Sequence, residues 1–430
     1  MGRLGRPQQH AGARHRRVPA GPPGLPRRDR GHRVGLAVRK AFQPTGLRAR
    51  GVPPSLIRWV YDLAQEVPGA ISLAVGEPDF PTPAHIVEAG QAALGAGFTR
   101  YSPNPGYLDL REAIAEKRLR VSGVKVDPAS EVFVTVGAME ALMLTFMVGI
   151  DPGDEVLVTD PSYSNFVSQI TLAGGVPVYV PTDPENGYLP APEAIRAALT
   201  SRTRAVLVNS PANPTGAVYP RDLLHAIGEL AQSHDLLIVS DETYEALVYG
   251  DVQHVSLASI PGLADRTVSI YSFSKEYAMT GWRIGYLLGP APMLRVMATV
   301  QEQMCSCVNA ATQRAALAAL RGSQECVATM RRAYERRRNL VVERLNRIPG
   351  VRCPRPDGAF YAFPDVRAVT HDTKALAERL LYEEKVVVSP GEAFGPRSAG
   401  FLRLSYASSD GALTEGLDRL AVGLAKTRGA

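Results

Sequence analysis

Residues 267–275 read Thr-Val-Ser-Ile-Tyr-Ser-Phe-Ser-Lys, a short β-branched and aromatic run that ends on two serines and a lysine. A run of this length and composition predicts a buried strand rather than a helix. Ligands of open α/β sheets bind outside the carboxyl ends of the strands, so Ser272 and Lys275 stand where chemistry is expected. A lysine in such a partly desolvated position has a lowered pKa and becomes nucleophilic enough for Schiff-base chemistry, although most lysines that follow a strand are merely solvated.

Similar β-rich runs lie on both sides of this stretch and alternate with helical segments. Nearly continuous apolar strands are typical of a mostly parallel sheet that helices cover on both faces. The predicted fold class is therefore α/β, with a mostly parallel central sheet covered by helices. The further predicted strands are residues 132–136, 155–159, 205–209, 236–240 and 284–288.

The chain is expected to form a large domain and a smaller α/β domain to which both chain ends contribute. A long helical tract, residues 292–348 with an interruption near 321–323, follows the sheet, and a mixed tail follows the tract. The expected division is a disordered basic arm at 1–45, the N-terminal part of the small domain at 46–80, the large domain at 81–325, and the C-terminal part of the small domain at 326–430.

The net charge of +6 is concentrated at the start of the chain. Residues 1–50 hold 13 Lys and Arg residues against Asp29, a net of +12, so residues 51–430 carry −6. The body of the protein thus lacks the basic face of a nucleic-acid-binding domain. The arm is too poor in apolar residues to order itself, and either it is a dispensable extension or the true start lies downstream. A transit peptide is the weaker alternative, because the arm is rich in Arg and poor in acids but is neither Ser-rich nor amphipathic.

Two further absences in the sequence narrow the functional classes. No run reaches the roughly 18 apolar residues of a membrane-spanning helix, so no membrane insertion is expected. The four cysteines form no Cys-x-x-Cys pair, and no histidine pair has metal-ligand spacing. We therefore expect no metal and a reducing, cytoplasmic location.

Polar residues follow several other predicted strands. Asp241 ends one strand, where it could keep a ligand's ring nitrogen protonated or simply cap a helix. Gly137 stands between a strand and a helical run, where free backbone amides could hold a phosphate. Asn213 lies in a turn-forming cluster, and Tyr163 could stack on an aromatic ring or occupy an exposed loop.

These features, in this order, resemble the class I and II aminotransferase family of fold-type-I pyridoxal-phosphate (PLP) enzymes. The resemblance extends from about residue 55 to the C-terminus. It is carried by Leu73-Ala-Val-Gly76-Glu-Pro-Asp-Phe80, Tyr101-Ser-Pro-Asn-Pro-Gly-Tyr-Leu-Asp-Leu-Arg111, Asn213-Pro-Thr-Gly216, Asp241-Glu-Thr-Tyr244, Ser272-Phe-Ser-Lys275, Gly281-Trp-Arg283 and Arg403-Leu-Ser-Tyr406.

The resemblance implies a role for each of these site residues. Lys275 would carry PLP as a Schiff base and shuttle the proton at the substrate Cα, with Asp241 and Tyr244 completing the catalytic group. Asp241 would pair with the ring nitrogen. The remaining implied contacts to the cofactor come from Asn213 and Tyr244 at its phenolic oxygen, Tyr163 at the ring, Gly137, Ala138, Ser272 and Arg283 at the phosphate, Met139 nearby, and Tyr101 from the neighbouring subunit of a homodimer with shared active sites.

The resemblance also implies how substrates bind. Arg403, with Gly76 and Asn213, would receive the α-carboxylate, and a guanidinium fixes its orientation better than an ammonium group. Some family members that act on aspartate carry a lysine at the position of Met139, so a neutral amino acid donor is slightly favoured here, with an aspartate or aromatic aminotransferase as the alternative.

The expected function is transfer of an amino group from an α-amino acid to a 2-oxo acid by a ping-pong mechanism through pyridoxamine phosphate. A PLP-dependent carbon–sulfur β-lyase is the enzymatic alternative, because one fold serves several PLP reactions. A PLP-sensing transcription regulator would need a folded DNA-binding module in front, and residues 1–50 lack the length and apolar periodicity for one.

Overall fold

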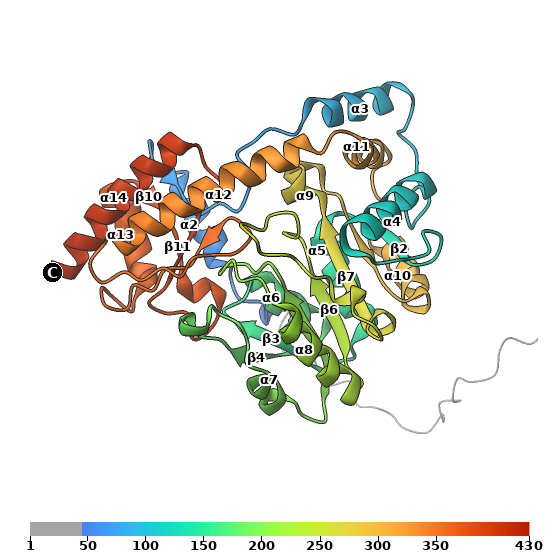
Figure 1. Ribbon diagram of the computed structural model, residues 1–430, viewed down its shortest axis with the longest axis horizontal. Coiled ribbons are helices and arrows are strands. Elements are labelled where there is room, and N and C mark those ends of the chain that lie inside the picture. Colours follow the sequence, from blue (N-terminus) through green and yellow to red (C-terminus); the bar gives the residue numbers. More distant parts are fainter. Residues whose placement is uncertain (1–44, 430) are drawn as a thin grey trace, which may run out of the picture. The chain divides into compact units, whose positions relative to one another are not determined.

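The structure, a computed structural model that describes residues 45–429, is built around a seven-stranded sheet (Figure 1). The strand order is β2-β8-β7-β6-β5-β3-β4. The pairs from β4 through β7 are parallel, and β8 is antiparallel to both of its neighbours. This confirms the predicted α/β class and mostly parallel sheet. The strands are β2 (Val132–Thr135), β3 (Glu155–Asp160), β4 (Val176–Pro181), β5 (Thr203–Asn209), β6 (Leu237–Asp241), β7 (Thr267–Ser272) and β8 (Gly285–Leu288).

Helices cover both faces of this sheet because its strands are apolar on both sides. In β5, Ala205 and Leu207 enter one core cluster and Val206 and Val208 enter another, as the two-residue period of a strand requires. Burying each such valine or leucine contributes roughly 1.5–3 kcal/mol. One face packs on α5 (Gly137–Gly149), α6 (Ser164–Ala173) and α10 (Ala291–Met304), and the other on α4 (Leu108–Ser122), α7 (Pro192–Ala198), α8 (Arg221–Ser233) and α11 (Ala310–Arg321).

The sequence analysis missed one strand of the central sheet and one helix break. The edge strand β4 is partly exposed and contains Pro177, which cannot donate to a ladder, so its run lacked the apolar pattern of the central strands. The helical tract also breaks between α10 and α11. Asn309 caps α11 by accepting a hydrogen bond from the backbone of Thr312 at 2.9 Å, a start signal that could have been read from the sequence.

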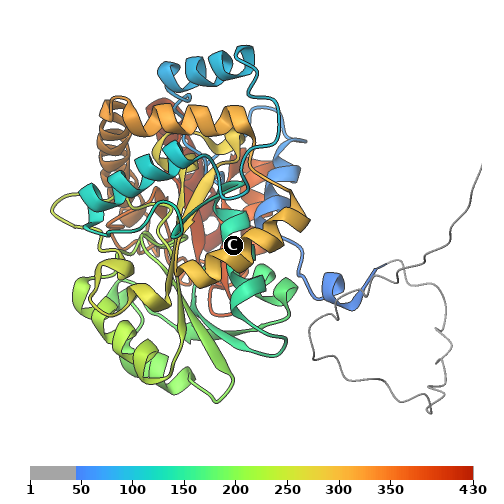
Figure 2. The same ribbon diagram turned by 90° about the vertical axis from the view of Figure 1, so that its right-hand side faces the viewer.

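Segments from both ends of the chain meet around a separate core cluster. The strand β1 (Ile71–Ser72) pairs in parallel with β10 (Val386–Val387), and β11 (Ser389–Pro390), β12 (Leu402–Ser405) and β9 (Tyr361–Ala362) form a small antiparallel sheet. The last helices lie to one side of the central sheet in Figure 1 and behind it in the turned view of Figure 2. The helices here are α2 (Leu56–Ala64), α12 (Glu325–Asn346), α13 (Thr373–Glu384) and α14 (Asp410–Gly429).

These pairings support the proposal that 46–80 and 326–430 make a smaller domain beside the large one. The helices that remain are α1 (Leu47–Arg50), α3 (Ala84–Gly95) and α9 (Phe273–Glu276). The basic arm expected at 1–45 lies outside the described residues, apart from Thr45. Within residues 45–429, no helix combines the length and hydropathy that crossing a bilayer requires.

Candidate active site

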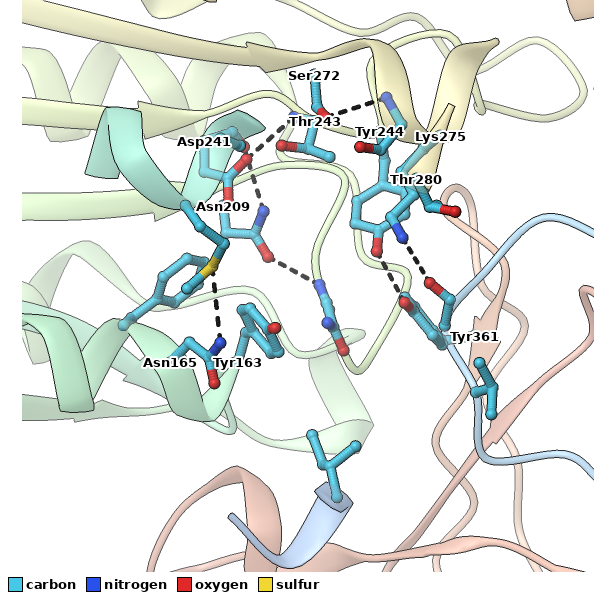
Figure 3. Close-up of a pocket in the computed structure, with 18 of the residues that line it drawn as sticks. Tyr163, Asn165, Asn209, Asp241, Thr243, Tyr244, Ser272, Lys275, Thr280 and Tyr361 are labelled. Atoms are coloured by element: carbon cyan, nitrogen blue, oxygen red, sulfur yellow. Dashed lines mark hydrogen bonds between the residues drawn. The ribbon is translucent and has the colours of Figure 1, made fainter. Parts of the chain in front are cut away.

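A cavity of about 460 Å³ opens at the carboxyl ends of the central strands (Figure 3). Its lining combines residues from the strand ends with residues from β9, β12 and α2. Most of the side chains singled out in the sequence are brought together there. Those that line it are Gly76, Ala138, Met139, Tyr163, Asn213, Asp241, Tyr244, Ser272, Lys275, Arg283 and Arg403.

Lys275 lies directly beyond the end of β7, in the single turn of α9. Ser272 caps this turn by accepting a hydrogen bond from the backbone N–H of Ser274 at 3.1 Å. The Lys275 ammonium donates to the carbonyl oxygen of Gly76 at 2.5 Å. Burial lowers the pKa of Lys275 to about 8; Glu77 opposes this effect, while the charges of Arg403 and Arg283 add to it. A larger fraction of neutral, nucleophilic amine is therefore present at pH 7 than for an ordinary lysine.

Asp241 ends the neighbouring strand β6 and is buried. Its Oδ1 accepts a hydrogen bond from the Thr243 backbone at 3.1 Å, and the residues that follow form a turn, not the helix of the capping alternative. Burial raises the pKa of Asp241 to about 6, although the hydrogen bonds from Thr243 partly oppose the rise. Among the described residues no ion pair joins Asp241 to a cation, so its carboxylate lacks a charge partner within the protein.

A basic corner forms where α5 begins. Gly137, the first residue of α5, has a φ of 73°, and a Cβ there would come within 2.7 Å of Nη2 of Arg283. Arg283 itself has a φ of 52°, a conformation that costs a non-glycine residue roughly 1–2 kcal/mol. Its Nη1 donates to the carbonyl oxygen of Thr280 at 2.9 Å. The glycine thus allows a guanidinium to sit against a helix N-terminus, an arrangement that favours anions.

Arg403 of β12 supplies a second buried cation. Its Nη1 donates to Oδ1 of Asn213 at 3.2 Å, and its Nη2 donates to the carbonyl oxygen of Ala74 at 2.5 Å. Its buried Nε has no hydrogen-bond partner among the described residues. A buried guanidinium that contacts neutral acceptors retains most of its capacity to bind a carboxylate.

Aromatic side chains form the remaining walls. Tyr163 precedes α6 and packs edge-on against Phe166, with ring centroids 5.5 Å apart, and burial raises its pKa to about 12. The hydroxyl of Tyr244 lies 2.8 Å from that of Tyr361. Burial, together with the neighbouring Tyr361, raises the pKa of Tyr244 well above its ordinary value, so this hydroxyl stays protonated. A Cβ at Gly76 would collide with the Tyr361 hydroxyl, which explains the glycine there.

Asn209 and Tyr361 are among the polar residues of the cavity that the sequence reasoning missed. Asn209 ends β5; its Nδ2 donates to the backbone oxygen of Asp241 at 3.2 Å, and its Oδ1 accepts from the backbone of Asn213 at 2.8 Å. Its place at a strand end was a usable signal. Tyr361 comes from the short strand β9, more than 100 residues after Tyr244 in the chain, and nothing in its local sequence marks it.

Tyr101 stands apart from the other predicted residues. It does not line the cavity, and 87% of its surface is exposed. Gly137 also is not among the lining residues; Arg283, which a Cβ at Gly137 would meet, does line the cavity. The cavity as described is therefore built without a contribution from Tyr101 of the same chain.

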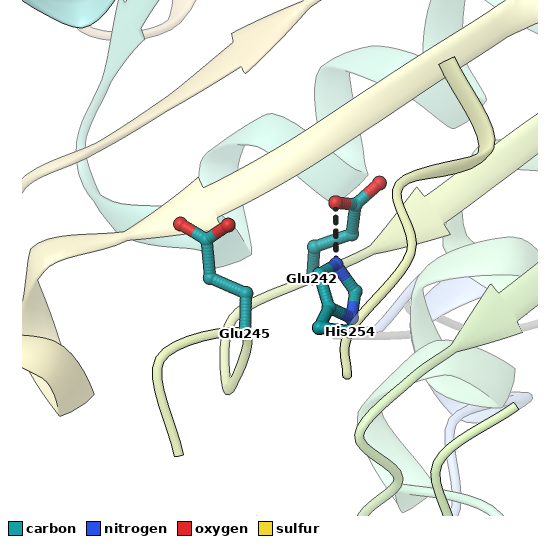
Figure 4. A group of neighbouring side chains, drawn as sticks. All are labelled: Glu242, Glu245 and His254. Carbon is teal, nitrogen blue, oxygen red and sulfur yellow. Dashed lines mark hydrogen bonds and ion pairs between the residues drawn. The ribbon is translucent and has the colours of Figure 1, made fainter. Parts of the chain in front are cut away.

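Glu242, the residue after Asp241, belongs to a buried polar network (Figure 4). Its carboxylate lies 2.9 Å from Nε2 of His254 and accepts hydrogen bonds from Tyr271 and two serines. The nearby Glu245 forms a two-point ion pair with Arg118 at 2.6 Å. The three potential ligand atoms of Glu242, Glu245 and His254 lie within 4.8 Å of one another. The carboxylates of Glu242 and Glu245 already accept hydrogen bonds. The three residues are therefore part of a hydrogen-bonded network next to the cavity.

Comparisons with known proteins agree over nearly the whole described chain. The family profile described as aminotransferase class I and II matches residues 68–420. Aromatic-amino-acid aminotransferase 2 of Thermococcus litoralis is 43% identical over 375 residues, covering 87% of this chain and 96% of that protein. Aspartate aminotransferase of Pyrococcus abyssi is 42% identical, covering 86% and 95%. The solved structure of aspartate aminotransferase from Thermus thermophilus with maleate has a TM-score of 0.84 at 42% identity, covering 89% and 100%.

Proposed function

The chain belongs to the class I and II aminotransferase family, and we propose on that premise that its cavity performs amino-group transfer with Lys275 as the reactive amine. The enzyme is PLP-dependent and moves an amino group from an α-amino acid to a 2-oxo acid. The observation that carries the assignment of Lys275 is its place at the end of β7, with a lowered pKa, between the cations Arg283 and Arg403.

The residues around the cavity fit PLP. Arg283 beside the first amides of α5, with the Ser272 hydroxyl, suits a phosphate dianion. At the other side, the buried carboxylate of Asp241 suits a protonated ring nitrogen, because each charge would compensate the other out of water. Tyr163 offers an aromatic face, and Tyr244 and Asn213 offer donors for the phenolic oxygen. A protonated ring neighbour would also return the pKa of Asp241 toward its ordinary value.

Lys275 is proposed to move the proton at the substrate Cα. When bound, PLP supplies an electron-poor ring that delocalises the negative charge left on this carbon. Asp241 holds the proton on the ring nitrogen that makes the ring electron-poor. Lys275 would take the proton from the substrate Cα and deliver it to C4′ of the cofactor, and a near-neutral pKa suits a group that must both accept and donate.

Arg403 is proposed to orient the substrate. Its guanidinium, held by Asn213 and the backbone of Ala74, would bind the α-carboxylate through two parallel hydrogen bonds. Fixing the carboxylate would also fix the rotation about the bond between the amino nitrogen and Cα of the substrate. The Cα–H bond would then point toward Lys275. This orientation favours proton loss over the other bond cleavages open to a PLP enzyme.

We also propose a homodimer with shared active sites. Tyr101 is exposed, and in the resemblance this tyrosine reaches the phosphate of the neighbouring subunit.

A cytoplasmic location is proposed as well, supported by four cysteines that are all free of disulfides. No described helix is suited to span a membrane.

A neutral amino acid is the proposed donor. Met139 lines the cavity with an apolar side chain, and its sulfur lies 3.6 Å from Nδ2 of Asn165. The relatives are named for aspartate, with an acidic side chain, and for aromatic amino acids, with neutral ones. Both classes therefore belong in a substrate panel with 2-oxoglutarate, pyruvate and oxaloacetate as acceptors.

A single half-reaction tests this function. The PLP-loaded enzyme is mixed with one amino acid in the absence of any oxo acid, and the products are counted. Aminotransfer predicts one equivalent of oxo acid per site, no ammonia, and an amino group retained on the protein. Continuous release of ammonia and oxo acid would indicate the β-lyase alternative instead.

A further inference from the structure

We propose that Arg58 of α2 binds the distal carboxylate of dicarboxylic substrates, an inference that rests on the proposed function and adds a substrate class to it. Among the described residues that line the cavity, four are cations. Three of them have roles in the proposed mechanism: Lys275 as the amine, Arg283 at the phosphate and Arg403 at the α-carboxylate. Arg58 is the one that remains.

The helix α2 holds Arg58 at the cavity. Ser55 caps the helix and accepts a hydrogen bond from the Arg58 backbone at 3.2 Å. On the far side of α2, Val60 is fully buried in a cluster with Leu381 and Val387 and so anchors the helix. Because residues three apart share a helix face, Arg58 and Tyr61 lie together on the side that lines the cavity. Their contact, with the guanidinium carbon 5.0 Å from the ring centre, steadies the long side chain.

The Arg58 guanidinium is available for an anion. Its side chain is 71% exposed and its Nε lies 2.9 Å from Oδ1 of Asp62, one turn further along α2. Exposed ion pairs of this kind contribute little to stability, so an incoming carboxylate can compete with Asp62. Within the described residues, the two Nη groups make no hydrogen bond, which leaves them free to bind a second carboxylate in parallel.

The charges of the cavity fit a dianionic substrate. Asp241 is the sole carboxylate among its described lining residues, and it is assigned to the ring nitrogen. With Arg283 facing a phosphate and Arg403 an α-carboxylate, the charge of Arg58 has no partner in the cavity wall. Met139 and Ile57 offer apolar contacts to uncharged side chains. One cavity can thus take a neutral donor and a dicarboxylic acceptor in alternate half-reactions.

The test compares substrate pairs that differ in one charged group. The readout is the ratio of kcat/KM for glutamate to that for glutamine, and for aspartate to asparagine, in the full-length PLP-loaded enzyme. Arg58→Gln is expected to lower this ratio by about twofold to fivefold. Arg58→Lys keeps the charge and should recover part of the ratio. Asp62→Asn is the matched control on the same helix; it removes the competing carboxylate and should leave the ratio unchanged or raise it.

Salt provides a second readout, because an exposed ion pair is screened. Raising the ionic strength should increase KM for glutamate but not for glutamine in the wild type, and Arg58→Gln should abolish this difference. An unchanged ratio in Arg58→Gln would overturn the role of Arg58 while leaving aminotransfer intact. Failure of the wild-type enzyme to transaminate any pair would instead overturn the proposed function.

Discussion

At the scale of single residues, burial shifts the pKa values of two site residues, Lys275 and Asp241, in opposite directions. Desolvation disfavours the ammonium form of Lys275 and the carboxylate form of Asp241, so it lowers one pKa to about 8 and raises the other to about 6. Each group is thereby brought near neutral pH. This range suits Lys275, which must both accept and donate a proton, whereas the proposed role of Asp241 is to remain a carboxylate against the protonated ring nitrogen.

The lowered pKa of Lys275 predicts how the rate of PLP attachment to the cofactor-free enzyme depends on pH. Only the neutral amine attacks PLP, so the rate of attachment should rise about tenfold per pH unit below pH 8 and level off above it. Stopped-flow absorbance of the Schiff base measures this rate. A rate that keeps rising to about pH 10 would mean that Lys275 titrates as an ordinary solvated lysine.

Replacing Asp241 by asparagine should separate cofactor binding from catalysis. The amide keeps the shape but cannot hold the ring-nitrogen proton, so Asp241→Asn should bind PLP yet slow Cα–H exchange with deuterium on the order of 100-fold or more. The control is Asp160→Asn: Asp160 is also buried and ends β3, but it does not line the cavity. Equal exchange rates in the two variants would move the ring-nitrogen role to another residue.

At the scale of elements, the strand ends were the part of the site that the sequence could predict. Ser272, Asp241 and Gly137 each follow an apolar run, and a parallel sheet brings such positions to one edge. Position at a strand end did not predict Arg403 or Gly76 as site residues. Both were inferred from the family resemblance. Tyr361 was missed altogether, because its place depends on how β9 and β12 pack beside the large sheet.

Met139, in the first turn of α5, is the residue on which the predicted substrate preference rests. With Met139 in place of a cation, the wild type should prefer alanine, leucine, methionine or phenylalanine to aspartate. Met139→Lys should raise the ratio of kcat/KM for aspartate to that for leucine by roughly tenfold, because each ~1.4 kcal/mol of transition-state binding is a factor of ten. Met139→Leu is the control that keeps the position apolar. An aspartate preference of tenfold or more in the wild type would refute the inference from Met139.

At the scale of the whole molecule, the cavity draws on segments from the entire described chain. Arg58 comes from its beginning, the strand ends from its middle and Arg403 from near its end. The sequence predicted the classes of element, but distances across the site, such as that between Tyr244 and Tyr361, follow only from tertiary packing. The proposed homodimer would add a segment from a second chain, because Tyr101 is exposed and does not line the cavity of its own chain.

Hybrid dimers test the proposed sharing of sites. Tyr101→Phe alone should weaken PLP binding, and Lys275→Ala alone should abolish transamination. In a mixed dimer, the subunit that carries Tyr101→Phe keeps its own Lys275 and would receive an intact Tyr101 from its partner. Co-expression should therefore restore one site of normal PLP affinity per hybrid dimer. If the hybrid binds PLP no better than the Tyr101→Phe protein, Tyr101 does not act across a subunit interface.

The central claim is that Lys275 forms the covalent link to PLP, and borohydride reduction tests it most directly. Hydride converts the C=N bond of the Schiff base into a stable secondary amine, and peptide mass spectrometry then locates the modified lysine. We expect one phosphopyridoxyl group per chain, on Lys275, and none in Lys275→Ala treated in the same way. A label on another lysine of the wild-type protein, or one that persists in Lys275→Ala, would contradict it.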